Sequence, residues 1–213
     1  MARRFDPSVY LVTDGRLCAA RGVVETVRAA IDGGVTAVQL RDPSVPARVL
    51  VATAKALVAL LRPRGIPLIV NDRADVALAA DADGVHLGQD DLAPRHARRL
   101  LGPGRIIGLS VGSPAEFAAS ADQLPFVDYL GTGPLRVTTT KADAGAAIGI
   151  EGLVAVRTLT TLPLVAIGGV DAALAAEAAA AGADGVAVVS AICGAPDPAA
   201  AAAAIAAAFR EAQ

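Results

Sequence analysis

Residues 67–91 read PLIVNDRADVALAADADGVHLGQDD, and they give the clearest indication of the fold. An apolar, strand-like run (67–70) precedes a stretch of helix formers, which Asp72 or Asp75 could cap, and a second strand-like run, GVHL, follows at 84–87. Neither run alternates between apolar and polar residues, and this favours parallel strands that are covered by helices. The stretch therefore predicts one strand–helix–strand unit, which ends in an amide and two carboxylates.

The same alternation of strand and helix continues along the chain. Eight apolar runs are predicted as strands: 9–13, 37–40, 67–70, 84–87, 105–110, 127–132, 162–168 and 185–190. Helices are expected behind Ser113-Pro114, Asp171 and Pro198, and AADAD (79–83) is echoed by AAGAD (180–184) as in equivalent units. These features predict an α/β fold, a single-domain (β/α)8 TIM barrel over residues 1–213, with a doubly wound open sheet as the alternative.

Composition indicates a protein that acts on small molecules. The chain has 19 basic and 21 acidic residues and a net charge of −2, without the basic runs typical of nucleic-acid or lipid surfaces. No leader is visible, and the Ala-rich stretch 199–209 is too short to span a bilayer. Cys18 and Cys193 lack metal-type spacing and are expected to be reduced structural thiols. We therefore expect a cytoplasmic protein without nucleic-acid or membrane partners; whether it forms a homo-oligomer is left open.

Polar residues follow most predicted strands, at the edge where a TIM barrel holds its active site. In chain order they are Gln39, Arg41, Asn71, Asp72, Gln89, Asp90, Asp91, Ser110, Thr138, Thr139, Thr140 and Lys141, and the last two strands end in Gly168-Gly169 and Val189-Ser190. Taken singly, an Asp after a strand commonly caps a helix and a Gly pair commonly forms a turn. Taken together, these residues predict one site on a common rim.

The charges on this rim indicate a metal ion and a polyanion. Asp72 and Asp91 could supply oxygen ligands to Mg²⁺, which typically takes one or two protein carboxylates together with phosphate oxygens and water. The alternative is that Asp91, or its neighbour Asp90, caps the next helix. Arg41 and Lys141 are the matching cations for a phosphate-bearing ligand. The loops after the last two strands fit a second phosphate site.

Several motifs resemble those of thiamine-phosphate synthases, in the family's order and over nearly the whole chain. They are VQLRD (38–42), NDR (71–73), GVHLGQDDL (84–92), DYLGTGPL (128–135), TTTKADAG (138–145), VAIGGV (165–170) and GADGVAVVSAI (182–192). The resemblance implies a TIM barrel and a reaction that joins 4-amino-5-hydroxymethyl-2-methylpyrimidine diphosphate to a thiazole phosphate. Pyrophosphate is released, Mg²⁺ is the cofactor, and the substitution is dissociative.

The resemblance also implies a role for each matching residue. Its pyrimidine-diphosphate contacts are Gln39, Arg41, Asn71, Ser110 and Lys141; its Mg²⁺ ligands are Asp72 and Asp91; its thiazole-phosphate contacts are Thr138, Thr140, Gly169, Val189 and Ser190, with Thr139 beside them. Arg41, Ser110 and Lys141 are the residues expected to act in catalysis.

Three positions depart from the family pattern. Pro43 stands where a lysine is usual, so one phosphate contact is missing. Arg136 precedes the TTTK loop and is either a substitute for that lysine or a solvated charge. Gly112 replaces a residue that is polar in many relatives.

Two other functions are compatible with these motifs. A thiazole tautomerase of the same superfamily would need a His at the position of Gly112, and neither His86, expected in the core or behind the site, nor His96, expected to be exposed, is placed for that role. A non-catalytic binding protein for thiazole or thiamine phosphate is the second alternative. Asp72, Asp91 and Lys141 favour the synthase, because only the synthase binds a diphosphate.

Overall fold

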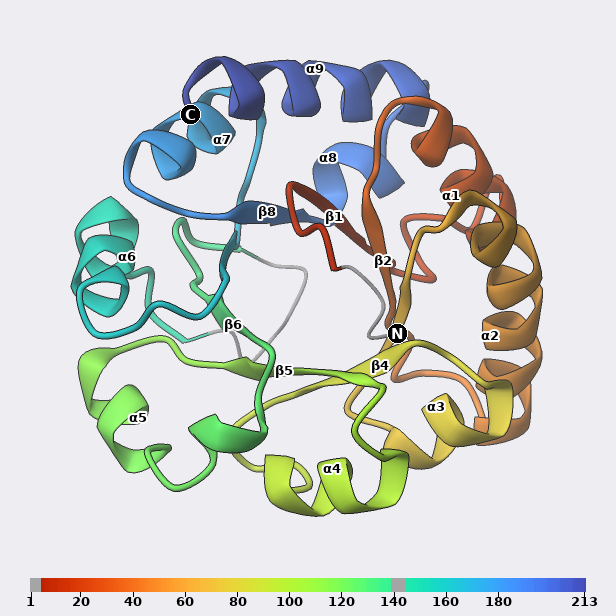
Figure 1. Cartoon of the computed structure of the whole chain (residues 1–213). Helices are drawn as coiled ribbons and strands as arrows, with labels where there is room; N and C mark the ends of the chain where they lie inside the picture. The colour runs from red at the N-terminus through yellow and green to blue at the C-terminus, as the bar shows by residue number, and fades with distance from the viewer. Residues whose placement is uncertain (1–4, 139–144) are drawn as a thin grey trace.

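Eight parallel strands form a closed barrel in this computed structural model, which describes residues 5–138 and 145–213. Each strand pairs with its neighbours in chain order, and β8 pairs with β1 to close the sheet. Figure 1 shows the helices in a ring around the barrel, with α9 between α7 and α1. The last helix therefore packs against the first one. The predicted (β/α)8 barrel is confirmed, and the open-sheet alternative is wrong.

The strands agree with the predicted runs to within two residues at either end. They are β1 (Val9–Val12), β2 (Ala37–Leu40), β3 (Leu68–Asn71), β4 (Gly84–Leu87), β5 (Ile106–Ser110), β6 (Tyr129–Thr132), β7 (Leu164–Ile167) and β8 (Gly185–Val188). The helices are α1 (Val23–Asp32), α2 (Ala47–Leu61), α3 (Ala74–Ala80), α4 (Pro94–Leu101), α5 (Pro114–Ala119), α6 (Gly149–Arg157), α7 (Ala172–Ala180), α8 (Ser190–Cys193) and α9 (Pro198–Glu211), with 3-10 turns η1 (Arg62–Arg64) and η2 (Leu124–Phe126). None of the helices within the described ranges is long and apolar enough to cross a membrane.

The predicted helix starts are confirmed at three helices and wrong at one. Ser113 and Asp171 each accept a backbone N–H three residues further on, and α9 begins at Pro198. Helix α3 instead follows Arg73 and has no side-chain cap, and Asp75 lies inside its first turn, so neither predicted acid caps it. Asp72 does not cap it, because its backbone adopts a left-handed conformation (φ 59°) that turns the chain before the helix begins.

Two apolar layers fill the molecule. One lies between the strands and the helices, and it includes the buried Cys18 and Cys193, which form no disulfide. The other fills the barrel interior with the inward-facing side chains of Tyr10, Val12, Ala37, Ile69, Ile106, Tyr129, Val165 and Ala187. The Phe5 ring packs on Tyr10 and Tyr129, with centroid distances of 5.9 and 4.5 Å. The barrel is therefore a packed core, as is usual for this architecture.

The residue that precedes each even-numbered strand is bonded twice to the preceding odd-numbered strand. Its side chain accepts one backbone N–H near the start of that strand, and its own N–H donates to the carbonyl of the same residue. The four pairs are Thr36 with Val9, Asp83 with Leu68, Asp128 with Ile107 and Asp184 with Leu164, with side-chain bonds of 3.0, 2.8, 2.7 and 2.8 Å. Asp83 and Asp184 end the two sequence echoes, which therefore mark equivalent units of the barrel.

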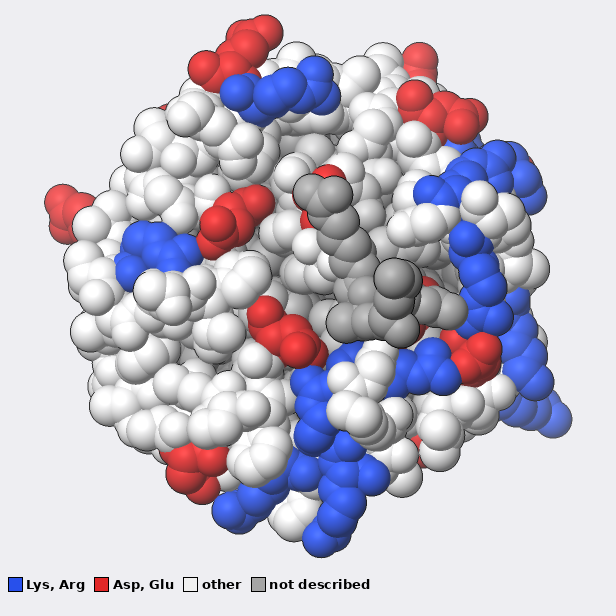
Figure 2. Space-filling view, viewed as in Figure 1, with Lys and Arg blue, Asp and Glu red and all other residues white. Residues whose placement is uncertain are grey.

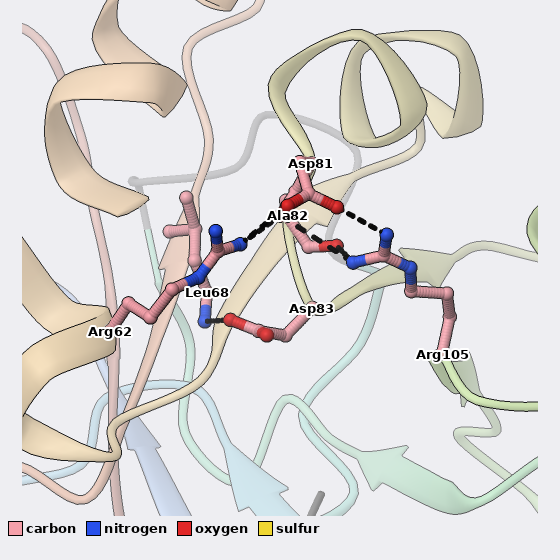
Figure 3. Close-up of polar contacts among 6 residues, drawn as sticks. All are labelled: Arg62, Leu68, Asp81, Ala82, Asp83 and Arg105. Carbon is pink, nitrogen blue, oxygen red and sulfur yellow. Dashed lines mark hydrogen bonds and ion pairs between the residues drawn. The ribbon is translucent and has the colours of Figure 1, made fainter. Parts of the chain in front are cut away.

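Arginine side chains bind loops that precede even-numbered strands, and the loop with Asp81 and Asp83 is an example. Figure 3 shows Asp83 at the Leu68 N–H, while Asp81 lies between Arg62, whose Nη2 is 2.8 Å from Asp81 Oδ2, and Arg105. The hydrogen bonds from Arg105 and Arg62 lower the pKa of Asp81. In the view of Figure 2, Lys and Arg side chains gather over α2, α3 and α4. Part of this basic surface therefore serves to hold loops together.

Candidate active site

A cavity of about 340 Å³ opens at the carboxyl ends of the strands. Eight of the residues predicted to contact a substrate line it: Gln39, Arg41, Asn71, Ser110, Thr138, Gly169, Val189 and Ser190. They come from the ends of β2, β3, β5, β6, β7 and β8 or from the loops that follow, so closure of the barrel brings them to one place. Thr139, Thr140 and Lys141 lie outside the described residues.

Arg41 is the only Lys or Arg among the described residues of the cavity wall. Its backbone is held by Thr13, whose hydroxyl accepts the Arg41 N–H at 3.0 Å and donates to the Arg41 carbonyl at 3.3 Å. Within residues 5–138 and 145–213, the Arg41 guanidinium makes no hydrogen bond or ion pair. A fixed backbone and an uncommitted five-donor group suit the binding of an anion.

Asn71 and Asp72 form the next part of the rim, at the end of β3. The Asp72 N–H donates to the His86 carbonyl at 2.8 Å, and this bond ties the turn to β4. Asn71 Nδ2 donates to Asp72 Oδ2 at 2.6 Å. The left-handed turn at Asp72 thus places an amide and a carboxylate side by side on the rim, where both could contact a substrate or its metal ion.

The structure of the loop after β4 excludes the alternative that Asp90 or Asp91 caps the next helix. Asp91 Oδ2 accepts the Gly88 N–H at 2.7 Å, so Asp91 closes its own loop. Helix α4 begins at Pro94 behind Ala93 without a side-chain cap, and the capping alternative is therefore wrong for both acids. Asp90 lines the cavity, whereas Asp72 and Asp91 are exposed next to lining residues.

The donor chemistry of this rim fits a magnesium ion. In the described part of the chain, no group of three or more His, Cys, Asp or Glu side chains is placed to hold a metal. Mg²⁺ typically needs only one or two protein carboxylates and takes its other ligands from phosphates and water. Asp72 and Asp91 follow adjacent strands and are exposed, and Asp91 uses only Oδ2 within its loop. They therefore fit as the protein's share of such a site.

Arg136 does not replace the missing lysine. Its Nη1 lies 3.0 Å from Asp171 Oδ2, its Nη2 lies 3.6 Å from Glu177, and it is absent from the cavity wall. It is also more than a solvated charge, because these ion pairs join the loop after β6 to α7. Within the described cavity wall, nothing cationic compensates for Pro43.

The cavity wall includes residues that the sequence analysis missed. Gly112 donates its N–H to Glu116 Oε2 at 2.7 Å, and both residues line the cavity. Tyr10, Tyr129 and His86 line it as well. The alternation of side chains along each strand could have identified Tyr10, since it pairs with Ala37, two residues before Gln39 on the same face of the neighbouring strand.

The two histidines lie in different surroundings. His86 is half-buried, with Nδ1 2.9 Å from Tyr129 Oη and Nε2 2.9 Å from Ser110 Oγ. His86 is thus partly in the core, as predicted, but it also lines the cavity instead of standing behind the site. His96 on α4 is half-buried rather than exposed, because it lies against Arg99 of the same helix.

Comparison with known proteins identifies the family. The family model described as thiamine monophosphate synthase matches residues 9–192. A thiamine-phosphate synthase of Xanthobacter autotrophicus is 63% identical over 208 residues, covering 98% of each chain, and one of Azorhizobium caulinodans is 58% identical over 197 residues, covering 92% of each. The solved structure of a thiamine phosphate pyrophosphorylase from Pyrococcus furiosus superposes with a TM-score of 0.87 at 38% identity and covers 98% of each chain. The resemblance noted in the sequence is therefore confirmed, and the chain belongs to the thiamine monophosphate synthase family of enzymes.

Proposed function

We propose that this enzyme is a Mg²⁺-dependent thiamine-phosphate synthase. It joins 4-amino-5-hydroxymethyl-2-methylpyrimidine diphosphate to 4-methyl-5-(2-phosphoethyl)thiazole and releases pyrophosphate. The observation that carries the proposal is that the wall of one cavity contains predicted contacts for both substrates, one set from β2, β3 and β5 and the other from the loops after β6, β7 and β8. Two substrates held at one barrel mouth can react directly with each other.

The first set of residues binds the diphosphate. Arg41 offers a planar fork of donors, and Asn71 offers an amide beside Asp72. Mg²⁺ held by Asp72 and Asp91 would neutralise charge on the diphosphate. Lys141 adds a second cation according to the family motif. As the carbon–oxygen bond breaks, its electron pair leaves with pyrophosphate, and Arg41 and Lys141 stabilise the charge that develops there.

The second set binds the thiazole phosphate. Gly168 and Gly169 have φ values of 99° and 67°, and a Cβ on Gly168 would lie 2.4 Å from the Pro134 side chain. Only glycine suits this pair, and without side chains its backbone can approach a phosphate closely. Ser190 begins α8, whose first N–H groups have no intrahelical acceptor. Backbone N–H groups and the Ser190 hydroxyl therefore supply the donors for this second phosphate.

The reaction needs no covalent nucleophile from the protein. Loss of pyrophosphate leaves a methylene cation that the aminopyrimidine stabilises, and the lone pair of the thiazole nitrogen then forms the new carbon–nitrogen bond. Water would compete for the cation, so the chain's main tasks are to align the substrates and to exclude solvent. The cysteines are not needed, and both are buried away from the cavity wall.

A direct assay tests the proposal. Purified protein is mixed with both substrates, with and without Mg²⁺, and thiamine phosphate and pyrophosphate are measured. Equimolar products that require the metal are expected. If a folded protein binds thiazole phosphate but forms no product, the synthase proposal is wrong, and the tautomerase or binding-protein alternative takes its place.

A further inference from the structure

An unbroken row of hydrogen bonds crosses the barrel interior beneath the cavity. Gln39 Nε2 lies 3.0 Å from Tyr10 Oη, which lies 2.9 Å from Tyr129 Oη. Tyr129 Oη lies 2.9 Å from His86 Nδ1, and His86 Nε2 lies 2.9 Å from Ser110 Oγ. The row therefore connects β2, β1, β6, β4 and β5, and both its ends are predicted substrate contacts.

With the Gln39 amide oriented as in the structure, Nε2 towards Tyr10, the row has one direction. Gln39 Nε2 can only donate, so Tyr10 accepts from it and uses its own proton for Tyr129. Tyr129 then donates to His86 Nδ1, which must carry a lone pair, and the proton of the neutral ring lies on Nε2 and faces Ser110. The reverse direction would leave the Tyr10 proton without an acceptor in a fully buried site, which is costly.

Two further observations show that the phenols of this row are protonated and that the barrel has space for its rings. Burial raises the pKa of both Tyr10 and Tyr129, so each phenol keeps its proton at neutral pH. The barrel also leaves space for the row, since a Cβ on Gly108 would lie 2.2 Å from Tyr129 Cζ and 2.5 Å from His86 Nδ1, and one on Gly131 would lie 3.0 Å from His86 Cε1. Glycines on β5 and β6 thus make room for the Tyr129 and His86 rings.

We infer that Tyr10, Tyr129 and His86 are positioning residues that set the hydrogen-bond polarity of Gln39 and Ser110 towards the substrate ring. With Nε2 bound to Tyr10, Gln39 presents Oε1 as an acceptor. With its oxygen bound to His86, Ser110 presents its O–H as a donor. A ring that carries an amino group next to a ring nitrogen complements this pair. The inference rests on the proposed function, whose pyrimidine substrate has that pattern.

Kinetics of Tyr129→Phe test the inference. Without the phenol oxygen, the His86 tautomer is no longer set, and Ser110 is free to turn its proton towards the ring nitrogen of His86. We expect kcat/KM for the pyrimidine diphosphate to fall about tenfold or more. The inhibition constant of inorganic pyrophosphate, which has no ring, and the KM of the thiazole phosphate should change less than about twofold. Equal weakening of all three ligands, or no change in any, would overturn the inference.

A double-mutant cycle separates positioning from a general loss of stability. If Tyr129 acts through Ser110, Tyr129→Phe should have little further effect in a Ser110→Ala background. Tyr10→Phe provides a second variant should Tyr129→Phe not fold. Thr26→Val is the matched control, since Thr26 is also a buried, hydrogen-bonded hydroxyl but lies in α1, away from the cavity. Effects of Tyr129→Phe and Ser110→Ala that simply multiply would contradict the inference.

The His86 tautomer can be read without any turnover. The chain has two histidines, so ¹⁵N-histidine spectra are assigned with the single variant His96→Gln. We expect the neutral Nε2–H tautomer for His86 in the wild type and its loss in Tyr129→Phe. An Nδ1–H tautomer or a doubly protonated ring in the wild type would overturn the inference. This measurement needs no substrate, so it still tests the hydrogen-bond arrangement around His86 if the synthase assay fails.

Discussion

Arg41 has to supply much of the positive charge of the proposed diphosphate site, because it is the only Lys or Arg among the described residues of the cavity wall. We expect Arg41→Ala to lower kcat/KM for the pyrimidine diphosphate by about 10²-fold or more, since a cation that stabilises the leaving group acts mainly in the transition state. Steady-state kinetics with each substrate varied in turn measure the effect. The control is Arg28→Ala, which removes an exposed arginine paired with Glu25 on α1. Equal activity of the two variants would remove Arg41 from the mechanism.

Asp91 has two tasks that one substitution can separate. Asp91→Asn retains an oxygen for the Gly88 N–H, so the loop keeps its shape, but the negative charge is lost. We expect the Mg²⁺ concentration that gives half-maximal activity to rise about tenfold or more, because Mg²⁺ prefers charged oxygen ligands. Activity measured across a Mg²⁺ titration provides the test, and Asp90→Asn shows whether the acid on the cavity wall takes part. An unchanged Mg²⁺ requirement in Asp91→Asn would assign Asp91 to the loop alone.

At the scale of elements, the acids that precede β4, β6 and β8 connect neighbouring strands. Asp184 Oδ2 accepts the Leu164 N–H at 2.8 Å and also pairs with Arg157 at 2.8 Å. Asp184→Ala should lower the free energy of unfolding by about 1–3 kcal/mol, because the strand's first N–H loses its acceptor. Asp184→Asn keeps an acceptor and loses only a partly exposed ion pair, so it should cost less than about 1 kcal/mol. Urea unfolding would show the difference, and equal losses would mean that the ion pair carries the effect.

The stabilisation that Asp171 provides at the start of α7 is expected to depend on pH. The hydrogen bond from the Leu174 N–H, helped by Arg136, lowers the pKa of Asp171. Its ionised form therefore stabilises the fold above the unfolded carboxyl pKa of about 3.9, and this contribution is lost as the pH falls through the lowered folded pKa. Asn can still cap the helix, so wild type and Asp171→Asn should differ in unfolding free energy at pH 7 and converge in strong acid. A difference that stays constant down to low pH would exclude the charge as its cause.

At the scale of the whole molecule, the barrel is built around the two interior tyrosines. A Cβ on Gly108 would collide with Tyr129 and His86, whereas one on Gly104 would meet nothing within 4 Å. We expect Gly108→Ala to lower the free energy of unfolding by about 1–3 kcal/mol and to weaken pyrimidine-diphosphate binding, because the rings must shift. Gly104→Ala should change neither by more than about 0.5 kcal/mol. Chemical unfolding and direct binding measurements would show both effects. If the Gly108→Ala protein were as stable as Gly104→Ala, the barrel interior could accommodate an additional Cβ without loss of stability.

The number, type and order of the elements could be predicted because they depend on local preferences. The run GVHL coincides with β4, and Ser113 and Asp171 cap the helices that they precede. The rim residues were predictable too, since they follow strands whose ends meet at one side of a parallel sheet. The prediction failed where a side chain's direction depends on contacts that its own sequence neighbours do not indicate. Asp72 turns the chain instead of capping α3, and neither Asp90 nor Asp91 caps α4, because Asp91 bonds to Gly88 and the helix begins behind Ala93.

The barrel, its eight units and eight of the substrate contacts on the described cavity wall were thus predictable from local patterns, because periodicity and capping act within a few residues. Only the tertiary structure decided which groups touch within the barrel. Tyr10 and Tyr129 are 119 residues apart, and their hydroxyls meet at 2.9 Å because the closed sheet brings β1 and β6 around one narrow interior. The row of hydrogen bonds from Gln39 to Ser110 follows from that closure. A local pattern does not encode such a contact, since it depends on the register of all eight strands at once.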